Sequence, residues 1–115
     1  MPESINVRRF QKNLNGGIAA LVLLAILDKA QEDLYGYEIA KRLAEANGGV
    51  SIFKDGTISP VLRTLAAAGL LTSRIVPSYS GPPRRYYRIT EAGRGALAEW
   101  QPVWRQTRGL VEQFV

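Results

Sequence analysis

The chain of 115 residues contains no cysteine and no histidine. Without cysteine it can form neither disulfides nor thiolate metal sites, which fits a reducing compartment. Without histidine it also lacks the commonest general base and a major transition-metal ligand. Carboxylates, lysines and hydroxyls remain, but no nucleophile and base pair accompanies the neighbouring acids Asp28, Glu32 and Asp33. We therefore expect a protein that is not an enzyme and that binds no metal or other cofactor.

Long apolar runs are also missing from the sequence. The longest run, from Ile18 to Leu27, is too short to span a bilayer, and no small-residue cleavage site follows it closely. We interpret this run as a helix buried on all sides that begins at Gly16 and Gly17. Hydrophobic residues make up 46% of the chain and charged residues 22%, as in an ordinary soluble domain. These features predict one cytoplasmic domain without a membrane segment.

Acidic residues are absent between Asp55 and Glu91. The net charge of +5 arises entirely in this span, because the bases and acids on either side of it cancel. A basic block of this kind is typical of a surface that neutralises phosphates. The alternative is a solvated face that aids solubility. The block contains five arginines, namely Arg63, Arg74, Arg84, Arg85 and Arg88.

The apolar spacing predicts the order of elements along the chain. Residues 1–15 form an arm or a short helix, and the buried helix follows. The remaining elements are a second helix that ends at Gly48 and Gly49, a short strand at 50–53, a third helix from Thr57 to Ala68 that stops at Gly69, a hairpin of residues 70–76 and 84–90, and a last helix capped by Thr90. This order predicts a mainly α (α+β) fold, a winged helix-turn-helix over residues 16–89 followed by a helix over residues 90–115.

The third helix is the element that would enter the major groove of DNA. Its inward positions are Ile58, Leu62 and Leu65. Its outward side offers hydroxyls and an arginine, which can bond phosphates or base edges. Capping of the helix by Thr57 and Ser59, with Arg63 merely solvated, is the alternative. The candidate contacts here are Lys54, Thr57, Ser59, Pro60 and Arg63.

The second strand of the hairpin has two faces, because side chains alternate along a strand. Tyr87 and Ile89 fall on one face and are expected to pack on the core. The other face carries Arg84, Tyr86 and Arg88, which we expect to meet the DNA backbone. Arg85 shares the inward parity and is expected at the rim near the loop.

Apolar positions of the last helix follow a heptad series. Large side chains at such spacing form a seam for another helix, so we expect this segment to form a homodimer. The predicted seam consists of Leu97, Trp100, Trp104, Val111 and Phe114.

Four stretches of the chain resemble the PadR family of bacterial transcriptional regulators. They are "LYGYEIAKRL" at 34–43, "GTISPVLRTL" at 56–65, "GLL" at 69–71 and "GPPRRYYRITEAG" at 81–93. The resemblance implies a cytoplasmic homodimer with a recognition helix at 57–68, a wing at about 70–89 and a C-terminal dimerisation helix. It further implies repression that a small molecule relieves in many members. Two departures are Ser59, where the family usually has tyrosine, and the alanines at 66–68, which replace a typically charged stretch.

The tryptophans of the last helix are candidate effector-binding residues. Some multidrug-responsive members of the family place a tryptophan at the position of Trp104, where it stacks on flat aromatic ligands at the dimer interface. The alternative is that Trp100 and Trp104 only pack the dimer.

These observations predict a dimeric, sequence-specific DNA-binding regulator. We expect a repressor that binds an inverted-repeat operator in double-stranded DNA and that is relieved by a small aromatic effector. The alternative is a winged-helix module that binds protein or RNA without reading a groove.

Overall fold

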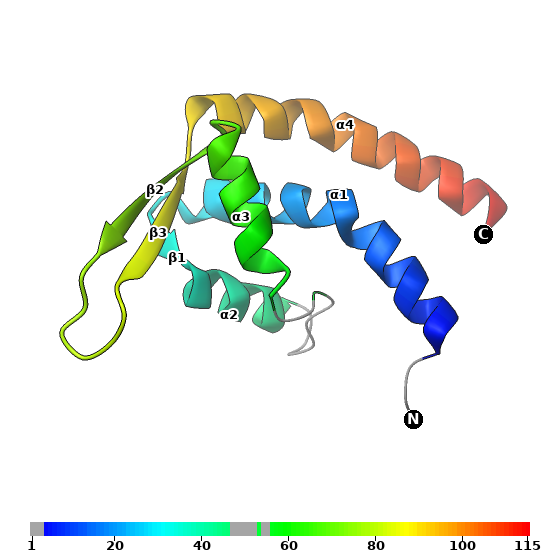
Figure 1. Cartoon of the computed structure of the whole chain (residues 1–115). Helices are drawn as coiled ribbons and strands as arrows, with labels where there is room; N and C mark the ends of the chain where they lie inside the picture. Colours follow the sequence, from blue (N-terminus) through cyan, green and yellow to red (C-terminus); the bar gives the residue numbers. More distant parts are fainter. Residues whose placement is uncertain (1–3, 47–52, 54–55) are drawn as a thin grey trace.

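The computed structural model describes residues 4–46, 53 and 56–115. Lys54, the predicted helix end at Gly48 and Gly49, and the predicted strand 50–53 apart from Phe53 lie outside these described residues. The fold is the mainly helical winged helix that the sequence predicts (Figure 1). Its elements are α1 (Ile5–Ala30), β1 (Leu34–Tyr35), α2 (Gly36–Ala46), α3 (Ile58–Ala67), β2 (Leu71–Val76), β3 (Arg84–Ile89) and α4 (Glu91–Phe114).

Helix α1 is longer than the sequence predicts. It begins at Ile5, because the Ser4 side chain caps it by accepting a hydrogen bond from the Val7 backbone N–H at 3.1 Å. The predicted start at Gly16 and Gly17 is therefore wrong, since the helix continues through both glycines. Residues 5–15 thus share one helix with the central segment of the core.

The C-terminal half of α1 supplies the centre of the core. Leu23, Leu24 and Leu27 are at most 1% exposed, whereas Leu21 and Ile26 are half-buried and pack at the edge of the cluster. The prediction of a helix buried on all sides is therefore wrong, because α1 is buried on one side and only partly covered on the other. By length and mean hydropathy alone α1 could cross a membrane, but a core helix of a soluble protein passes the same test.

The three strands form an antiparallel sheet in the order β1-β3-β2. The hairpin is confirmed, with Leu71 opposite Ile89 at its base. Strand β1, which the sequence did not predict, pairs Leu34 with Tyr87. Helices α1 and α3 pack on one face of this sheet through a shared core. The core cluster consists of Leu23, Leu24, Leu27, Leu34, Ile39, Leu62, Leu65, Leu71, Tyr87, Ile89 and Leu97.

The turn after α3 is joined directly to the start of α4. Gly69, at a φ of 79°, ends α3 as predicted, and the Leu70 N–H bonds back to the Leu65 carbonyl at 3.0 Å. Thr90 caps α4 by accepting from the Gly93 N–H, and its hydroxyl donates to the Gly69 carbonyl at 2.7 Å. The Thr90 N–H also donates to the Leu70 carbonyl. We refer to these contacts between the α3–β2 turn and the first turn of α4 as the α3–α4 joint.

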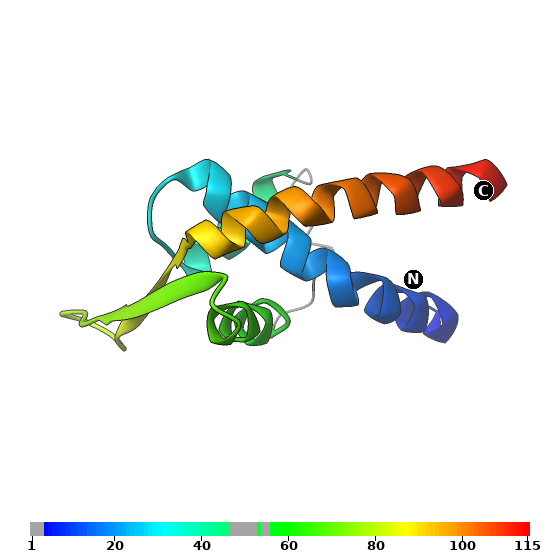
Figure 2. The ribbon, with the colours of Figure 1, turned by 90° about the horizontal axis from the view of Figure 1, so that it is seen from above.

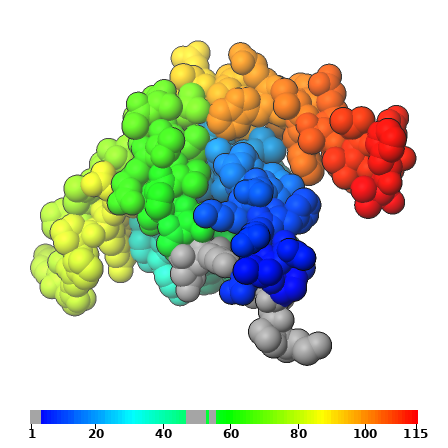
Figure 3. Space-filling model, turned by 45° about the vertical axis from the view of Figure 1, so that its right-hand side comes forward, coloured from blue at the N-terminus to red at the C-terminus, as the bar shows by residue number. Residues whose placement is uncertain are grey.

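The N-terminal half of α1 and the C-terminal half of α4 extend beyond the core on the same side of the molecule (Figures 1 and 2). Every residue from 101 to 115 is exposed. Figure 3 shows the end of α4 standing clear of the rest of the surface. Both helices therefore present side chains that the described residues of this chain do not cover.

Candidate nucleic-acid interface

Helix α3 presents a polar and basic side to solvent. Leu62 and Leu65 hold the helix on the core, and the opposite side exposes Ser59, Pro60 and Arg63. These three predicted residues therefore share one accessible surface, in the first half of the helix. In a helix-turn-helix, residues in this part of the helix reach base edges.

Thr57 and Lys54 are the two other DNA contacts predicted at this helix. Thr57 is half-buried at the N-cap position of α3, but its side chain makes no capping hydrogen bond, so capping does not account for its hydroxyl. Lys54, the predicted phosphate contact ahead of the helix, lies outside the described residues. The outward side of α3 is thus defined by Ser59, Pro60 and Arg63, with Thr57 at its edge.

The two faces of β3 are arranged as the alternation predicts. Tyr87 and Ile89 are each 5% exposed and lie in the core beneath α1 and α3. Arg84, Tyr86 and Arg88 therefore lie on the opposite face of the sheet, away from α3. We refer to that second face as the outer face of the wing, where the wing is the hairpin of β2 and β3 with its connecting loop.

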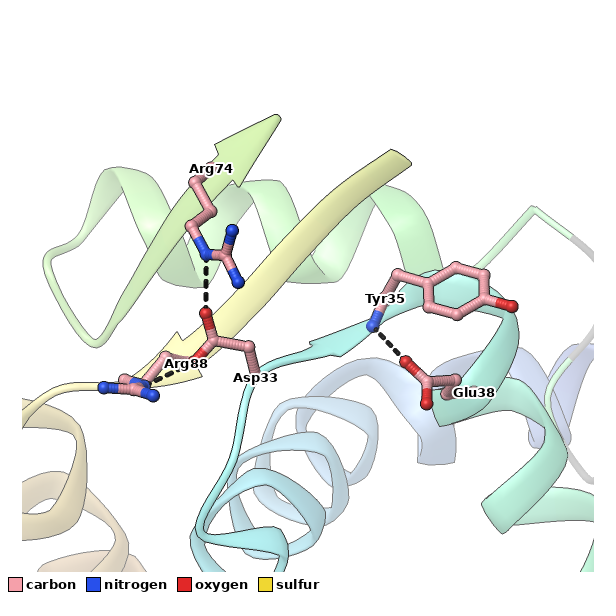
Figure 4. Close-up of polar contacts among 5 residues, drawn as sticks. All are labelled: Asp33, Tyr35, Glu38, Arg74 and Arg88. Carbon is pink, nitrogen blue, oxygen red and sulfur yellow. Dashed lines mark hydrogen bonds and ion pairs between the residues drawn. The ribbon is translucent and has the colours of Figure 1, made fainter. Parts of the chain in front are cut away.

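The outer face contains an acid that the charge pattern did not associate with the wing. Asp33, just ahead of β1, accepts a hydrogen bond from Arg74 Nε of β2 at 2.8 Å and another from Arg88 Nε of β3 (Figure 4). The two arginines are separated from Asp33 by 41 and 55 residues. One carboxylate thus connects the segment ahead of β1 to both β2 and β3.

The electrostatics of Asp33 follow from these contacts. The Arg74 hydrogen bond is the largest influence, and together with Arg88 it lowers the pKa of the Asp33 carboxyl below its ordinary value of 3.8, although partial burial opposes the shift. Only 15% of the Asp33 side chain is exposed, while both arginines keep more than half of their surface in water. The carboxylate is therefore charged at neutral pH and largely covered by its partners.

Aromatic rings extend the same cluster along the outer face. The Arg84 guanidinium lies 4.6 Å above the centre of the Tyr35 ring, and that of Arg74 lies 5.2 Å above the Tyr86 ring. The centres of the Tyr35 and Tyr86 rings are 5.4 Å apart. The three predicted contacts on this face, Arg84, Tyr86 and Arg88, are thus engaged within the chain, at the strand that sequence reasoning missed.

Arg85 is the basic residue of β3 that shares a sheet face with α3. It has the parity of Tyr87, but it lies nearer the tip of the wing, where the core no longer covers it. It is exposed, and its Nη1 donates to the Ser73 hydroxyl at 3.2 Å. The sequence placed Arg85 at the rim. The structure adds that its side of the sheet is the side on which α3 packs.

The predicted helical seam on α4 divides into two parts. Leu97 is 5% exposed and belongs to the core of its own chain, and Trp100 is half-buried against that core. The structure therefore assigns Leu97 to the core instead of to an interface, because the first turns of α4 pack on α1. Trp104, Val111 and Phe114 are exposed, as are Val103 and Leu110, which the heptad pattern did not include.

A second apolar surface on α1 was not predicted. Val7, Phe10 and Leu14 repeat at helical spacing and are 44–65% exposed. They lie in the part of α1 that extends beyond the core. Because the pattern of residues 1–15 does not decide between an arm and a helix, the sequence does not assign these side chains to one face of a helix.

Comparison with known proteins places this architecture among transcription factors. The model of the transcriptional regulator PadR-like family matches residues 23–99. The chain is 37% identical over 95 residues to the transcriptional regulator Rv3488 of Mycobacterium tuberculosis, and the match covers 81% of this chain and 78% of that protein.

Solved structures give the same picture for the fold. A transcriptional regulator from Clostridium thermocellum superposes with a TM-score of 0.79 at 25% identity, covering 90% of this chain and 98% of the other. A PadR family transcription regulator from Clostridium difficile superposes with a TM-score of 0.65 at 33% identity, covering 84% and 96%. The similarity therefore extends over nearly all of α1 to α4.

Proposed function

Because the chain belongs to the PadR-like family of transcriptional regulators and is thereby a DNA-binding regulator, we propose that it acts as a homodimeric repressor in the cytoplasm. In this proposal it binds an inverted-repeat operator, and a small aromatic effector releases it. The observation that carries the proposal is the exposed side of α3, which displays Ser59, Pro60 and Arg63. Arg85 adds an exposed cation on the face of the sheet against which α3 packs.

In the proposed complex α3 reads the major groove and the wing fixes its position. The Arg63 guanidinium can bond a guanine edge with two hydrogen bonds, and the Ser59 hydroxyl is small enough to contact either a base or a phosphate. Arg85 supplies a phosphate contact from the wing. The arginines between Asp55 and Glu91 thereby fall into two groups, according to the face of the structure on which they lie. The outer-face arginines support the wing, and Arg63 and Arg85 approach the duplex.

The homodimer is supported by the exposed apolar side chains of the two projecting helices. A soluble monomer rarely exposes many large apolar side chains close together, and here α4 and the start of α1 each expose several. Pairing of these helices with a second copy would bury Trp104, Val111 and Phe114. Twofold symmetry would then set the two recognition helices about 34 Å apart, one turn of DNA.

An effector site is supported by the position of Trp104. Its side chain is 40% exposed on the projecting part of α4, whereas Trp100 is half-buried on the core. An exposed indole at an interface between two copies can stack on a flat aromatic molecule. The competing interpretation, in which Trp104 only packs the dimer, makes a different prediction. Its fluorescence would then respond to dilution into monomers but not to aromatic compounds.

The test is a footprint on the DNA upstream of the gene, with gel shifts on that operator, an unrelated duplex and a structured RNA. We expect protection of an inverted repeat, strong salt dependence and loss of protection with one aromatic compound. Arg63→Ala should weaken operator binding about tenfold or more and leave the unrelated duplex nearly unchanged. Arg94→Ala, which removes an equal charge from α4, is the control. Equal binding of RNA and both duplexes would contradict the proposal and favour a module that does not read a groove.

A further inference from the structure

Among the described residues, the wing packs on the core at its base. Leu71, Tyr87 and Ile89 are buried there, whereas the residues from Thr72 to Ile75 are all exposed. Strand β1 adds pairing at only two positions, opposite Tyr86 and Tyr87. Few backbone contacts therefore fix the angle at which the wing leaves the body.

Side chains on the outer face supply the missing constraint. Asp33 connects the segment before β1 to both strands of the wing, through Arg74 and Arg88 (Figure 4). In Figure 4 these contacts lie on one side of the strands, with helix α3 behind them. A rotation of the wing toward or away from α3 would lengthen at least one of the two hydrogen bonds.

Asp33 carries a negative charge beside an element that we propose to bind DNA. A carboxylate beside a phosphate-binding surface opposes DNA binding, so electrostatics alone would disfavour it there. Here the carboxylate is only 15% exposed, since the two guanidinium groups cover it. Its negative field is therefore largely cancelled locally, and its hydrogen bonds remain.

We propose that Asp33 is a positioning residue for DNA recognition, which sets the orientation of the wing relative to α3 without contacting DNA. The proposal rests on the proposed function, in which the wing and α3 hold the same duplex. With the wing fixed, Arg85 meets its phosphate when α3 is in register in the groove. If the wing is free to move, the Arg85 contact and the groove contacts form together only after the wing has been ordered, and this ordering lowers the affinity.

The experiment compares Asp33→Asn with Glu32→Gln. Both variants remove one negative charge at adjacent positions, but Glu32 pairs with Arg42 of α2 and does not touch the wing. Operator and random-duplex affinities are measured for each variant at one salt concentration. Hydrogen exchange of amides in β2 and β3 is followed in the free protein.

We expect Asp33→Asn to weaken operator binding about tenfold, the value of one charge-assisted hydrogen bond, and to leave random-duplex binding unchanged or slightly tighter. Its wing amides should exchange faster, by a larger factor than the amides of α3, which open only when the whole domain unfolds. Glu32→Gln should change both affinities together and leave the exchange unchanged. A loss of overall stability would lower both affinities equally, so the ratio of the two separates positioning from folding.

The proposal is overturned if Asp33→Asn keeps the operator-to-random ratio of Glu32→Gln, or if its wing amides exchange as in the wild type. Should Asp33→Asn not fold, Arg74→Lys combined with Arg88→Lys repeats the test at unchanged net charge. Failure of the proposed function has a different signature. Arg85→Ala would then leave binding to every duplex unaltered, while the exchange of the free wing would still respond to Asp33.

Discussion

Replacing Gly93 with alanine should destabilise the protein although alanine is the better helix former. A Cβ at this position would lie 2.1 Å from the Leu70 carbonyl oxygen and 2.7 Å from Ile89 Cγ1. The Leu70 carbonyl cannot move away without loss of stability, because it accepts a hydrogen bond from the Thr90 N–H and belongs to the turn that ends α3. Overpacking of this kind costs about 3 kcal/mol, which exceeds the gain of about 1 kcal/mol in helix propensity.

Gly95 provides the matched control, since it lies two residues along the same helix with no atom near its missing Cβ. Gly95→Ala should raise the free energy of unfolding by about 0.5–1 kcal/mol. Gly93→Ala should lower it by about 2 kcal/mol, and the melting temperature by roughly 8 °C or more. The unfolding of both variants is followed by circular dichroism at one protein concentration, because dimer formation would make the stability depend on concentration. A Gly93→Ala protein as stable as Gly95→Ala would refute the packing described for the α3–α4 joint.

Three other predictions follow from charge and exposure. Because the pKa of Asp33 is lowered, its ion pairs stabilise the fold above pH 3.8, and this contribution disappears as the pH falls through the lower folded value. Unfolding curves of the wild type and Asp33→Asn should differ at about pH 7 and converge once the pH falls below the lowered pKa of Asp33 in the folded protein. Arg85→Ala should weaken binding to all duplexes and reduce the salt slope by about 1, whereas Arg84→Ala, whose guanidinium stacks on a ring, should affect the slope less. Val111→Glu and Phe114→Glu should shift the protein to monomers in sedimentation experiments, because each places a charge on an exposed apolar surface.

The elements with clean apolar spacing could be predicted from the sequence. Helix α3 and the hairpin follow directly from periods of 3.6 and 2 and from the stop at Gly69. The start of α1 could not, because Gly16 and Gly17 have low helix propensity and only the cap at Ser4 and the flanking residues outweigh it. Strand β1 has two residues and no local signal, since pairing with β3 across more than 50 residues creates it.

The candidate site divides in the same way. The outward side of α3 was predictable because helical spacing fixes which residues share a side. The role of the outer face was not, because Asp33 meets Arg74 and Arg88 only after the sheet has formed. A heptad pattern also cannot distinguish a partner from the chain's own core, which is why Leu97 was placed in the seam.

The α3–α4 joint makes α4 a lever in the proposed dimer. The helix has 24 residues and is therefore about 36 Å long, with the joint at one end and the exposed apolar residues toward the other. If the paired ends turn by about 5°, the recognition helix sweeps about 3 Å, close to the rise of one base pair. A ligand that wedges the paired ends by a small angle would therefore change the operator spacing that the dimer fits. Release from DNA would then require no unfolding of α3 or α4. A change in the distance between the two recognition helices would be enough.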